Sequence, residues 1–274
     1  MRQSVLWLWF ICFAPVCLAE SNLTPTEVVA SVYLPKAKPK ISIVIDDLGD
    51  NSVIAKKMLS LPVKLTAAIL PHTPHADLIA DYAKKQGHEV IMHLPMEALS
   101  RPDLLGPGAI YNNMAKGEMQ STISESADSV PNLVGFNNHM GSLLTQNQQK
   151  MQWVMESAKQ FGWYFLDSKT SQVSIAQDVA EQMGIANIGR DLFLDHQGVA
   201  PSIEEQFELM QKIAIKKGHV VAICHPYPET SRYLIENLTQ LQTDFEFVSV
   251  GQLIQQSHWQ KLINLSIGAH GAYH

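Results

Sequence analysis

The sequence predicts an α/β fold built on a parallel sheet, either a barrel or a doubly wound sheet. Short apolar segments of strand length alternate with amphipathic segments of helix length from about residue 41 to residue 250. The composition has no break and no tandem repeat within this stretch. Polar residues follow strand after strand, and the carboxyl ends of parallel strands in a barrel share one rim.

The first strand is expected at residues 41–45, where four of the five residues are β-branched aliphatics. Gly87, Gly162 and Gly218 are good ends for the helices that precede later strands. Further strands are expected at residues 63–70, 89–92, 133–136, 163–166, 186–188, 220–224 and 245–250, and helices at about residues 50–59, 75–86, 117–129, 146–161, 174–183, 202–217 and 231–241. The loop at residues 94–116 is long, and such loops in compact domains are commonly functional or mobile.

The two ends of the chain are expected to lie outside a single domain at residues 40–256. Residues 1–19 combine a short basic start, an apolar run and small residues, which is typical of a signal peptide cleaved after residue 19. Residues 20–39 contain three prolines and read as a flexible leader, and residues 257–274 lack periodicity and read as a flexible tail. The signal peptide predicts export, with the periplasm as the destination.

The composition narrows the range of partners. The chain has 274 residues, is 46% hydrophobic and carries a formal net charge of −6. Without a basic cluster it lacks the usual footprint of a protein that binds nucleic acid or an anionic membrane. The apolar run of the signal peptide is too short to span a membrane, and it is expected to be removed with that peptide. No span is therefore expected in the mature chain.

Two adjacent carboxylates, Asp46 and Asp47, follow the first strand. Placing two negative charges side by side costs free energy unless a cation or a shared proton offsets it. Helix capping would explain one of them, but Asp50 and Ser52 are better placed to cap the next helix. The pair therefore favours a metal site or an acid–base site.

Other strands end in similar residue types. The groups expected at this rim are Asp46-Asp47, His93 to Glu97, Asn137 to Ser142, Asp167 to Ser171, and His225. Each group alone is weak evidence for a metal site, because a histidine after a strand is more often a hydrogen-bonded rim residue than a ligand. Together they suit a mononuclear site of histidines and a carboxylate with an open position, as Zn²⁺ prefers.

Three of these segments resemble the motifs of polysaccharide deacetylases, the carbohydrate esterase family 4 group. Together with residues 137–142 and 167–169, they resemble its divergent branch in particular. The stretch Gly-His-Glu-Val-Ile-Met-His at residues 87–93 resembles the motif that leads into a metal-binding histidine. Ile-Asp-Asp-Leu-Gly at residues 45–49 and Ile-Cys-His at residues 223–225 resemble the first and last motifs, in the same order along the chain. The resemblance extends from about residue 41 to residue 250.

The resemblance implies a distorted (β/α) barrel of about seven parallel strands and a divalent metal, with Zn²⁺ expected. It also implies hydrolysis of an N- or O-acetyl group on a sugar, and the expected substrate is peptidoglycan or another N-acetylated glycan of the envelope. Carried over by position, Asp46 is the general base, Asp47 and His93 are metal ligands, and His225 is the general acid.

The chain departs from the family pattern in two places. Glu97 stands where the family has its second metal-binding histidine, so Glu97 and His139 are the candidates for the third ligand. His139 is favoured because imidazole is the commoner zinc ligand and because Asn138 and Ser142 can support it through hydrogen bonds. The family also has an arginine near the base, and residues 132–145 contain none.

Four further residues carry expectations about this site. Lys169 or Arg190 is expected to replace the missing arginine. Asp167 either orients His225 or the base through a hydrogen bond, or only caps its turn. Tyr111, in the long loop, is a candidate for stacking against a sugar ring.

Two functions of different classes fit these residues. The first is an envelope deacetylase that depends on a metal. The second is a barrel of the same kind that has lost turnover and binds cell-wall glycan or an envelope protein. A metal phosphoesterase is disfavoured because the rim has little positive charge for a phosphate.

Overall fold

The computed structural model describes residues 37–195 and 202–256, and the helices and strands among them belong to one compact unit that begins at Lys38. The strands are β1 Lys40–Leu48, β2 Thr66–Ile69, β3 Glu89–Met96, β4 Gly135–Met140, β5 Tyr164–Asp167, β6 Asn187–Gly189, β7 Leu192–Phe193, β8 His219–Cys224 and β9 Glu246–Phe247. The α-helices are α2 Ser52–Met58, α3 Ala76–Lys85, α4 Lys116–Asp128, α5 Gln148–Phe161, α6 Ala176–Gln182, α7 Ile203–Lys217 and α8 Pro228–Asn237. The predicted signal peptide, most of the leader and the tail lie outside the described residues.

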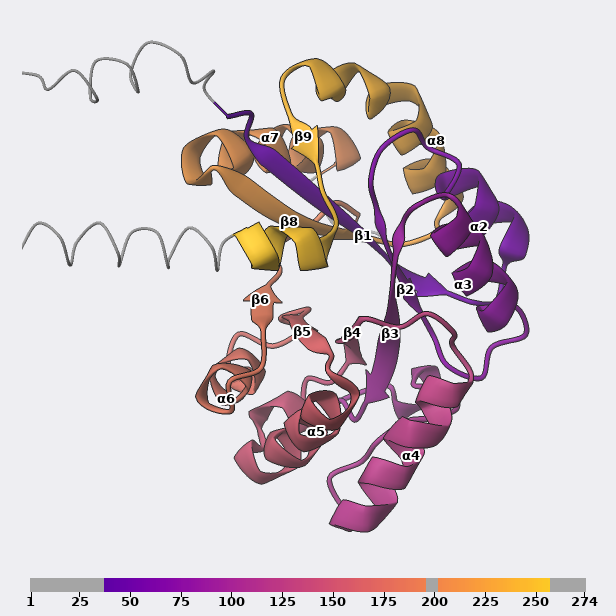
Figure 1. Cartoon of the computed structure of the whole chain (residues 1–274), viewed down its shortest axis with the longest axis vertical. Helices are drawn as coiled ribbons and strands as arrows, with labels where there is room; N and C mark the ends of the chain where they lie inside the picture. Colours follow the sequence, from indigo (N-terminus) through magenta and orange to yellow (C-terminus); the bar gives the residue numbers. More distant parts are fainter. Residues whose placement is uncertain (1–36, 196–201, 257–274) are drawn as a thin grey trace, which may run out of the picture. The chain divides into compact units, whose positions relative to one another are not determined.

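The strands form one parallel sheet in the order β6-β5-β4-β3-β2-β1-β8-β7, and β9 pairs with β1 outside this path. Strands β6 and β7 lie at opposite edges, yet only residues 190–191 separate them. The Arg190 backbone N–H donates to Asp167 in β5 at 2.9 Å, and the next N–H donates to Val221 in β8 at 2.8 Å. One short segment thus joins both edges, so the sheet curls into the distorted barrel that was predicted (Figure 1).

The number of strands differs slightly from the prediction. Eight strands lie on the continuous path of the sheet instead of about seven. The additional one is β7, which was missed because two residues are too few to give a recognisable alternation. The last predicted strand, at residues 245–250, shortens to β9, and a helix already begins at residue 250.

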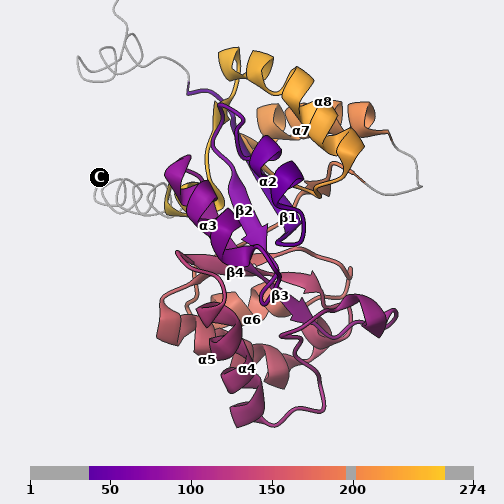
Figure 2. The same cartoon turned by 90° about the vertical axis from the view of Figure 1, so that its right-hand side faces the viewer.

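Helices lie around the sheet, as Figures 1 and 2 show, with α2 and α3 beside β1 and β2, and α4 and α5 beside β3 and β4. The odd-numbered residues Ile41, Ile43 and Ile45 of β1 pack in one cluster with Met58 of α2 and Ile79 of α3. Successive strand residues point to opposite faces, so the even-numbered residues of β1 face the interior of the barrel. None of the helices in the described ranges is long and apolar enough to cross a membrane.

An apolar layer fills the middle of the interior, and its members are Val44, Ala68, Ile91, Leu166, Val221 and Ile223. The residue two places after an interior residue returns to the same face of the strand. Asp46 follows Val44 in this way, His93 follows Ile91, and His225 follows Ile223. The strand period alone therefore places these three polar side chains together, above the apolar layer and at the carboxyl ends.

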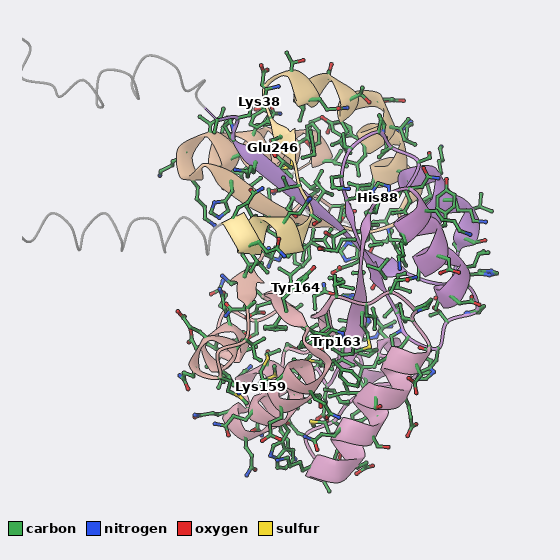
Figure 3. All side chains as sticks on the ribbon, in the orientation of Figure 1. Lys38, His88, Lys159, Trp163, Tyr164 and Glu246 are labelled. Carbon is green, nitrogen blue, oxygen red and sulfur yellow. The ribbon has the colours of Figure 1, made fainter. Side chains whose placement is uncertain are left out.

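A separate polar network closes the amino-terminal end of the barrel. The Glu89 carboxylate accepts hydrogen bonds from Thr66 Oγ1, Tyr164 OH, Ser249 Oγ and the Gly251 backbone N–H at 2.7–3.2 Å. His88 Nε2 lies 2.7 Å from the Leu59 carbonyl oxygen (His88 and Tyr164 are labelled in Figure 3). The first residues of the Gly-His-Glu stretch thus stabilise the fold at this end, and His93 alone reaches the rim.

Gly135 fixes how β4 fits beside β5. A Cβ atom at this position would lie 2.8 Å from the Tyr164 ring, which is closer than real Cβ atoms approach their neighbours. The ring occupies the interior face at the start of β5, where it donates to Glu89 at 2.7 Å. A glycine at residue 135 therefore lets β4 pass the ring without displacing it.

Candidate active site

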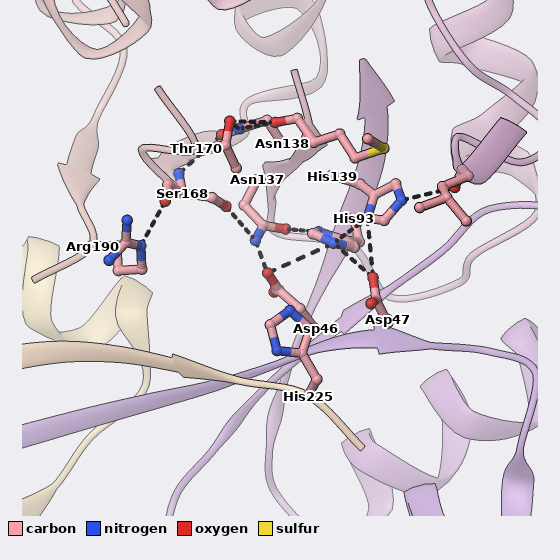
Figure 4. A network of polar contacts seen from close by, with 12 residues as sticks. Asp46, Asp47, His93, Asn137, Asn138, His139, Ser168, Thr170, Arg190 and His225 are labelled. Atoms are coloured by element: carbon pink, nitrogen blue, oxygen red, sulfur yellow. Dashed lines mark hydrogen bonds and ion pairs between the residues drawn. The ribbon is translucent and has the colours of Figure 1, made fainter. Parts of the chain in front are cut away.

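The interior polar residues meet in a cavity of about 300 Å³ at the carboxyl ends of the strands. Its lining residues are Asp46, Asp47, His93, Asn138, His139, Met140, Ser168, Thr170, Phe193 and His225. Figure 4 shows the polar contacts among most of these residues. The sequence-predicted base, ligands and acid are therefore brought together at one place.

Asp47, His93 and His139 form a compact cluster whose facing nitrogen and oxygen atoms all lie within 4.8 Å of one another. Asp47 Oδ1 lies 3.2 Å from His93 Nε2 and 3.0 Å from His139 Nδ1. The same two ring nitrogens lie 3.0 Å apart. A carboxylate oxygen and two imidazole nitrogens thus converge on one small volume.

The outer nitrogen of each ring shows which atoms carry the protons. His93 Nδ1 lies 2.8 Å from Asn137 Oδ1, and His139 Nε2 lies 3.2 Å from the Leu104 carbonyl oxygen. Both partners are acceptors, so both outer nitrogens carry a hydrogen, and in neutral rings the facing nitrogens carry lone pairs. Asp47 Oδ1 is buried and has no hydrogen bond of good geometry.

Three acceptor atoms that face one another require a positive charge between them. The donor set of one carboxylate and two imidazoles matches the ligands that Zn²⁺ takes in catalytic sites with an open position. Each imidazole also has the outer hydrogen bond that orients a metal-binding histidine. The residues therefore fit a divalent metal.

The charges in the cluster shift the pKa values in the directions that this arrangement requires. Burial would raise the pKa of Asp47, but contacts with His139 and His93 hold it well below its ordinary value. Burial would lower the pKa of His93, but Asp46 and Asp47 raise it. Without a metal, a proton on a ring takes the place of the cation.

The backbone at Asp47 explains how two consecutive side chains reach the same site. Neighbouring residues of a strand normally point to opposite faces, which would send Asp47 away from Asp46. Asp47 instead has φ of 54°, in the left-handed region, and the pairing of β1 with β2 is irregular between Ile45 and Leu48. Such strain in a residue other than glycine clusters at functional sites.

Asp46 is buried in the wall of the cavity and is 2% exposed. Its Oδ1 accepts a hydrogen bond from Asn137 Nδ2 at 2.9 Å, and its Oδ2 lies 3.6 Å from His93 Nε2. Burial raises the pKa of Asp46 above its ordinary value, although His93 and His225 oppose the shift. A carboxylate with a raised pKa beside a metal site is suited to accept a proton near neutral pH.

His225 lies across the cavity and is held by Asp195. Its Nδ1 donates to Asp195 Oδ1 at 2.8 Å, while Asp195 Oδ2 accepts from the His225 backbone N–H and from Thr230 Oγ1. The ring is stacked on Tyr227 at 5.3 Å and on Phe193 at 5.8 Å. Burial would lower the pKa of His225, but Asp195, Asp46 and Asp47 raise it to about 9.

Replacing Asp195 with asparagine is expected to reduce a pH dependence of stability in the metal-free protein. The pKa of His225 is about 9 in the folded chain and about 6.5 when unfolded, so its protonation stabilises the fold fully below pH ~6.5. This contribution, up to about 3 kcal/mol, is lost as the pH rises through 9. Urea unfolding at pH 6 and pH 9.5 in a chelator should show a smaller loss of stability for Asp195→Asn than for wild type. Equal losses would mean that Asp195 does not set this pKa.

Asp167 does not contact His225. Its Oδ1 accepts from the Lys169 backbone N–H at 2.8 Å, and its Oδ2 accepts from Ser174 Oγ at 2.9 Å. Of the alternatives for Asp167, these contacts support the cap of its own turn and not a catalytic role, and Asp195 takes the place beside His225. The physical reason is the closing segment of the sheet, which brings residue 195 beside β8.

Glu97 points into the long loop and away from the metal cluster. Its Oε2 accepts from the Asn112 backbone N–H at 2.7 Å. Ser142 Oγ, in turn, accepts from the Leu99 backbone N–H at 3.0 Å. Glu97 and Ser142 thus anchor the loop that supplies the Leu104 carbonyl to His139, and neither contacts the cluster directly. Tyr111 is half-buried in this loop and is not among the residues that line the cavity.

Lys169 and Arg190, the two candidates to replace the family's arginine, lie in different places. The Lys169 amine lies over Gly189, since a Cβ atom there would be 2.6 Å from it. Arg190 Nε donates to the Ser168 carbonyl oxygen at 2.6 Å, and its guanidinium lies 3.7 Å from the centre of the Phe193 ring. Arg190 therefore supports the wall of the cavity through Ser168.

Asn138 lines the cavity, but its side chain mainly forms hydrogen bonds with backbone groups. Its Oδ1 accepts from the Ser168 backbone N–H at 2.9 Å, and its Nδ2 donates to the Met140 carbonyl oxygen at 2.8 Å. It holds the ends of β4 and β5 together, and its described hydrogen bonds go to Ser168, Met140 and Thr170 and not to the His139 ring. Its neighbour Asn137, which was expected at the rim but without a role of its own, bonds both His93 and Asp46.

The role of Asn137 and the whole contribution of Asp195 were missed, although the sequence contains a signal for each. Asn137 shares the parity of His139, so both lie on the same face of β4. Asp195 directly follows the apolar residues 192–194, in the same relation that Asp46 has to the first strand.

Comparisons with known proteins agree with this architecture. The chain matches the family described as divergent polysaccharide deacetylase over residues 43–254. It is 36% identical over 235 residues to the uncharacterized protein YibQ of Escherichia coli (strain K12), covering 86% of this chain and 73% of that protein. It is 31% identical over 217 residues to an uncharacterized protein of Haemophilus influenzae, covering 79% of this chain and 77% of that one.

A solved structure shares the fold. The crystal structure of the uncharacterized protein ATU2773 from Agrobacterium tumefaciens C58 superposes with a TM-score of 0.74 at 21% identity. The superposition covers 85% of this chain and 96% of that chain. With the family match spanning nearly all of the described domain, the chain belongs to the divergent polysaccharide deacetylase family.

Proposed function

We propose that this protein is a metal-dependent hydrolase that removes acetyl groups from an N-acetylated glycan, acting on a carbon–nitrogen bond that is not a peptide bond. The observation that supports this proposal most strongly is the convergence of Asp47 Oδ1, His93 Nε2 and His139 Nδ1 beside the buried carboxylate of Asp46. Such a set combines a site for a Lewis acid with a base at one cavity.

Asp47, His93 and His139 would hold the metal, for which we propose Zn²⁺. When bound, this ion supplies polarisation of the acetyl carbonyl and acidification of a water. Asp46 accepts the proton of the attacking water, for which its raised pKa is suited. His225, with a pKa of about 9, is protonated at neutral pH and donates a proton to the departing nitrogen.

Asp195 has a supporting role in this scheme. It accepts the Nδ1 hydrogen of His225, so the other ring nitrogen, Nε2, faces the cavity with the proton to be donated. The negative charge of Asp195 raises the pKa of His225 and so keeps the ring protonated before the proton is transferred to the leaving group. The stacked Tyr227 and Phe193 rings fix the plane of the imidazole.

We further propose that the substrate is peptidoglycan or another acetylated glycan of the envelope, and that the protein acts in the periplasm. The predicted signal peptide at residues 1–19 supports this location. The family match supports an acetylated glycan as the substrate class.

The test combines metal analysis with an activity assay. Residues 20–274, purified without a histidine tag, are expected to carry about one Zn²⁺ per chain by mass spectrometry, and His93→Ala and His139→Ala are expected to lose it. The zinc-loaded chain is expected to release acetate from a chitooligosaccharide. Zinc binding without acetate release from this or a peptidoglycan substrate would favour the glycan-binding module instead. If the chain binds no zinc even after zinc is added, the proposal of a metal-dependent hydrolase is contradicted.

A further inference from the structure

We propose that Asn137 is a positioning residue that controls the metal ligand His93 and the base Asp46 through a single amide group. This inference rests in part on the proposed function, because Asp46 acts as a base only if the protein is a hydrolase. The part that concerns His93 stands on metal binding alone.

Asn137 is fully buried and makes three hydrogen bonds at the centre of the network in Figure 4. Its Oδ1 lies 2.8 Å from His93 Nδ1, and its Nδ2 donates to Asp46 Oδ1 at 2.9 Å and to Ser168 Oγ at 3.0 Å. These partners follow or lie in β3, β1 and β5, so one side chain ties three strands together.

The chemistry of the partners fixes the orientation of the amide. An ionised carboxylate only accepts hydrogen bonds, so the NH₂ group of Asn137 must face Asp46. Its oxygen then faces His93 Nδ1, and an oxygen in that place requires a hydrogen on Nδ1. The neutral His93 ring consequently keeps its lone pair on Nε2, the atom that faces Asp47 and His139.

The negative charge of Asp46 thereby determines which nitrogen of the metal ligand His93 carries the hydrogen. Asp46 selects the orientation of the amide, and the amide selects the tautomer of His93. This link through a neutral amide acts in addition to the direct approach of Asp46 Oδ2 to His93 Nε2 at 3.6 Å. The far side of Asn137 is held by Ser168, whose carbonyl oxygen accepts from Arg190.

Two variants separate the two halves of this role. Asn137→Ala removes both contacts, so zinc affinity should fall about 10–100-fold, as found when the outer partner of a metal-binding histidine is lost. Asn137→Asp retains an acceptor for His93 Nδ1–H, so zinc affinity should equal or exceed that of wild type. It has no N–H for Asp46 and adds a second carboxylate there, so kcat for acetate release should fall at least about 100-fold.

Zinc affinity is measured by competition with a chromophoric chelator, and turnover by acetate release at saturating zinc. The matched control is Asn187→Ala, because Asn187 is a half-buried strand residue whose amide bonds only the Ile185 carbonyl oxygen among the described contacts. This control should retain the zinc affinity and kcat of wild type. Thermal unfolding of the metal-free variants shows whether each one is folded.

The inference is overturned for His93 if Asn137→Ala binds zinc as wild type does, or if Asn137→Asp loses zinc to the same extent as Asn137→Ala. It is overturned for Asp46 if Asn137→Asp keeps the kcat of wild type. A wild-type protein that binds zinc but releases no acetate defeats the proposed function, and the Asp46 half with it. The zinc comparison of the folded Asn137→Asp variant with wild type and with Asn137→Ala still decides the His93 half.

Discussion

Replacing Asp47 with alanine is expected to lower zinc affinity by on the order of 100-fold or more, because it removes the one anionic ligand of the cluster. The two imidazoles that remain are neutral and cannot balance a divalent charge in a buried site. Acetate release should fall with the metal and return only in part at millimolar zinc. Competition with a chelator measures the affinity, and mass spectrometry measures the metal that stays bound after dialysis.

Asp50→Ala is the matched control for this variant. Asp50 is exposed and lies three residues after Asp47, in the segment that leads into α2, so its removal tests the loss of nearby negative charge without loss of a ligand. It should bind zinc as wild type does. Unchanged zinc binding in Asp47→Ala would mean that the cluster is not the metal site.

Replacing Asp46 with asparagine is expected to reduce kcat by about 10²–10⁴ while zinc remains bound. Asparagine has almost the same shape and its oxygen can still accept from Asn137, but it cannot take a proton from water. The variant therefore isolates the base from the metal site. Acetate release at saturating zinc measures the first effect, and chelator competition measures the second.

Asp50→Asn makes the same chemical change at an exposed position and should leave kcat unaltered. A kcat for Asp46→Asn within a few-fold of wild type would show that another group accepts the proton. Loss of zinc from Asp46→Asn would instead assign this carboxylate to the metal.

Most of the fold could be predicted because its signals are local. The apolar runs of β1, β3 and β8 are strong enough to be recognised alone, and their period of two already places Asp46, His93 and His225 on the interior face. Strand β7 could not be recognised in this way, because its pairing with β8 depends on the closure of the whole sheet.

The candidate site was harder to predict where a contact joins distant parts of the chain. Asp195 reaches His225 only because the segment after β6 crosses from one edge of the sheet to the other. Residue type favoured His139 over Glu97 as the third ligand but left both as candidates, since both can bind zinc. The hydrogen bond of Glu97 to Asn112 depends on the path of a loop that has no periodic signal.

The contact of Gly135 with Tyr164 fixes the register of β4, and this register determines which side chains β4 presents to the site. A shift of this strand by one residue would turn Phe136, Asn138 and Met140 inward in place of Gly135, Asn137 and His139. The site would keep an amide but exchange an imidazole for a thioether, which is a poor ligand for zinc. Such a shift would also drive the Phe136 ring into Tyr164, where no side chain fits. A residue without a side chain, at the far end of the strand from the metal cluster, thus protects the identity of a ligand.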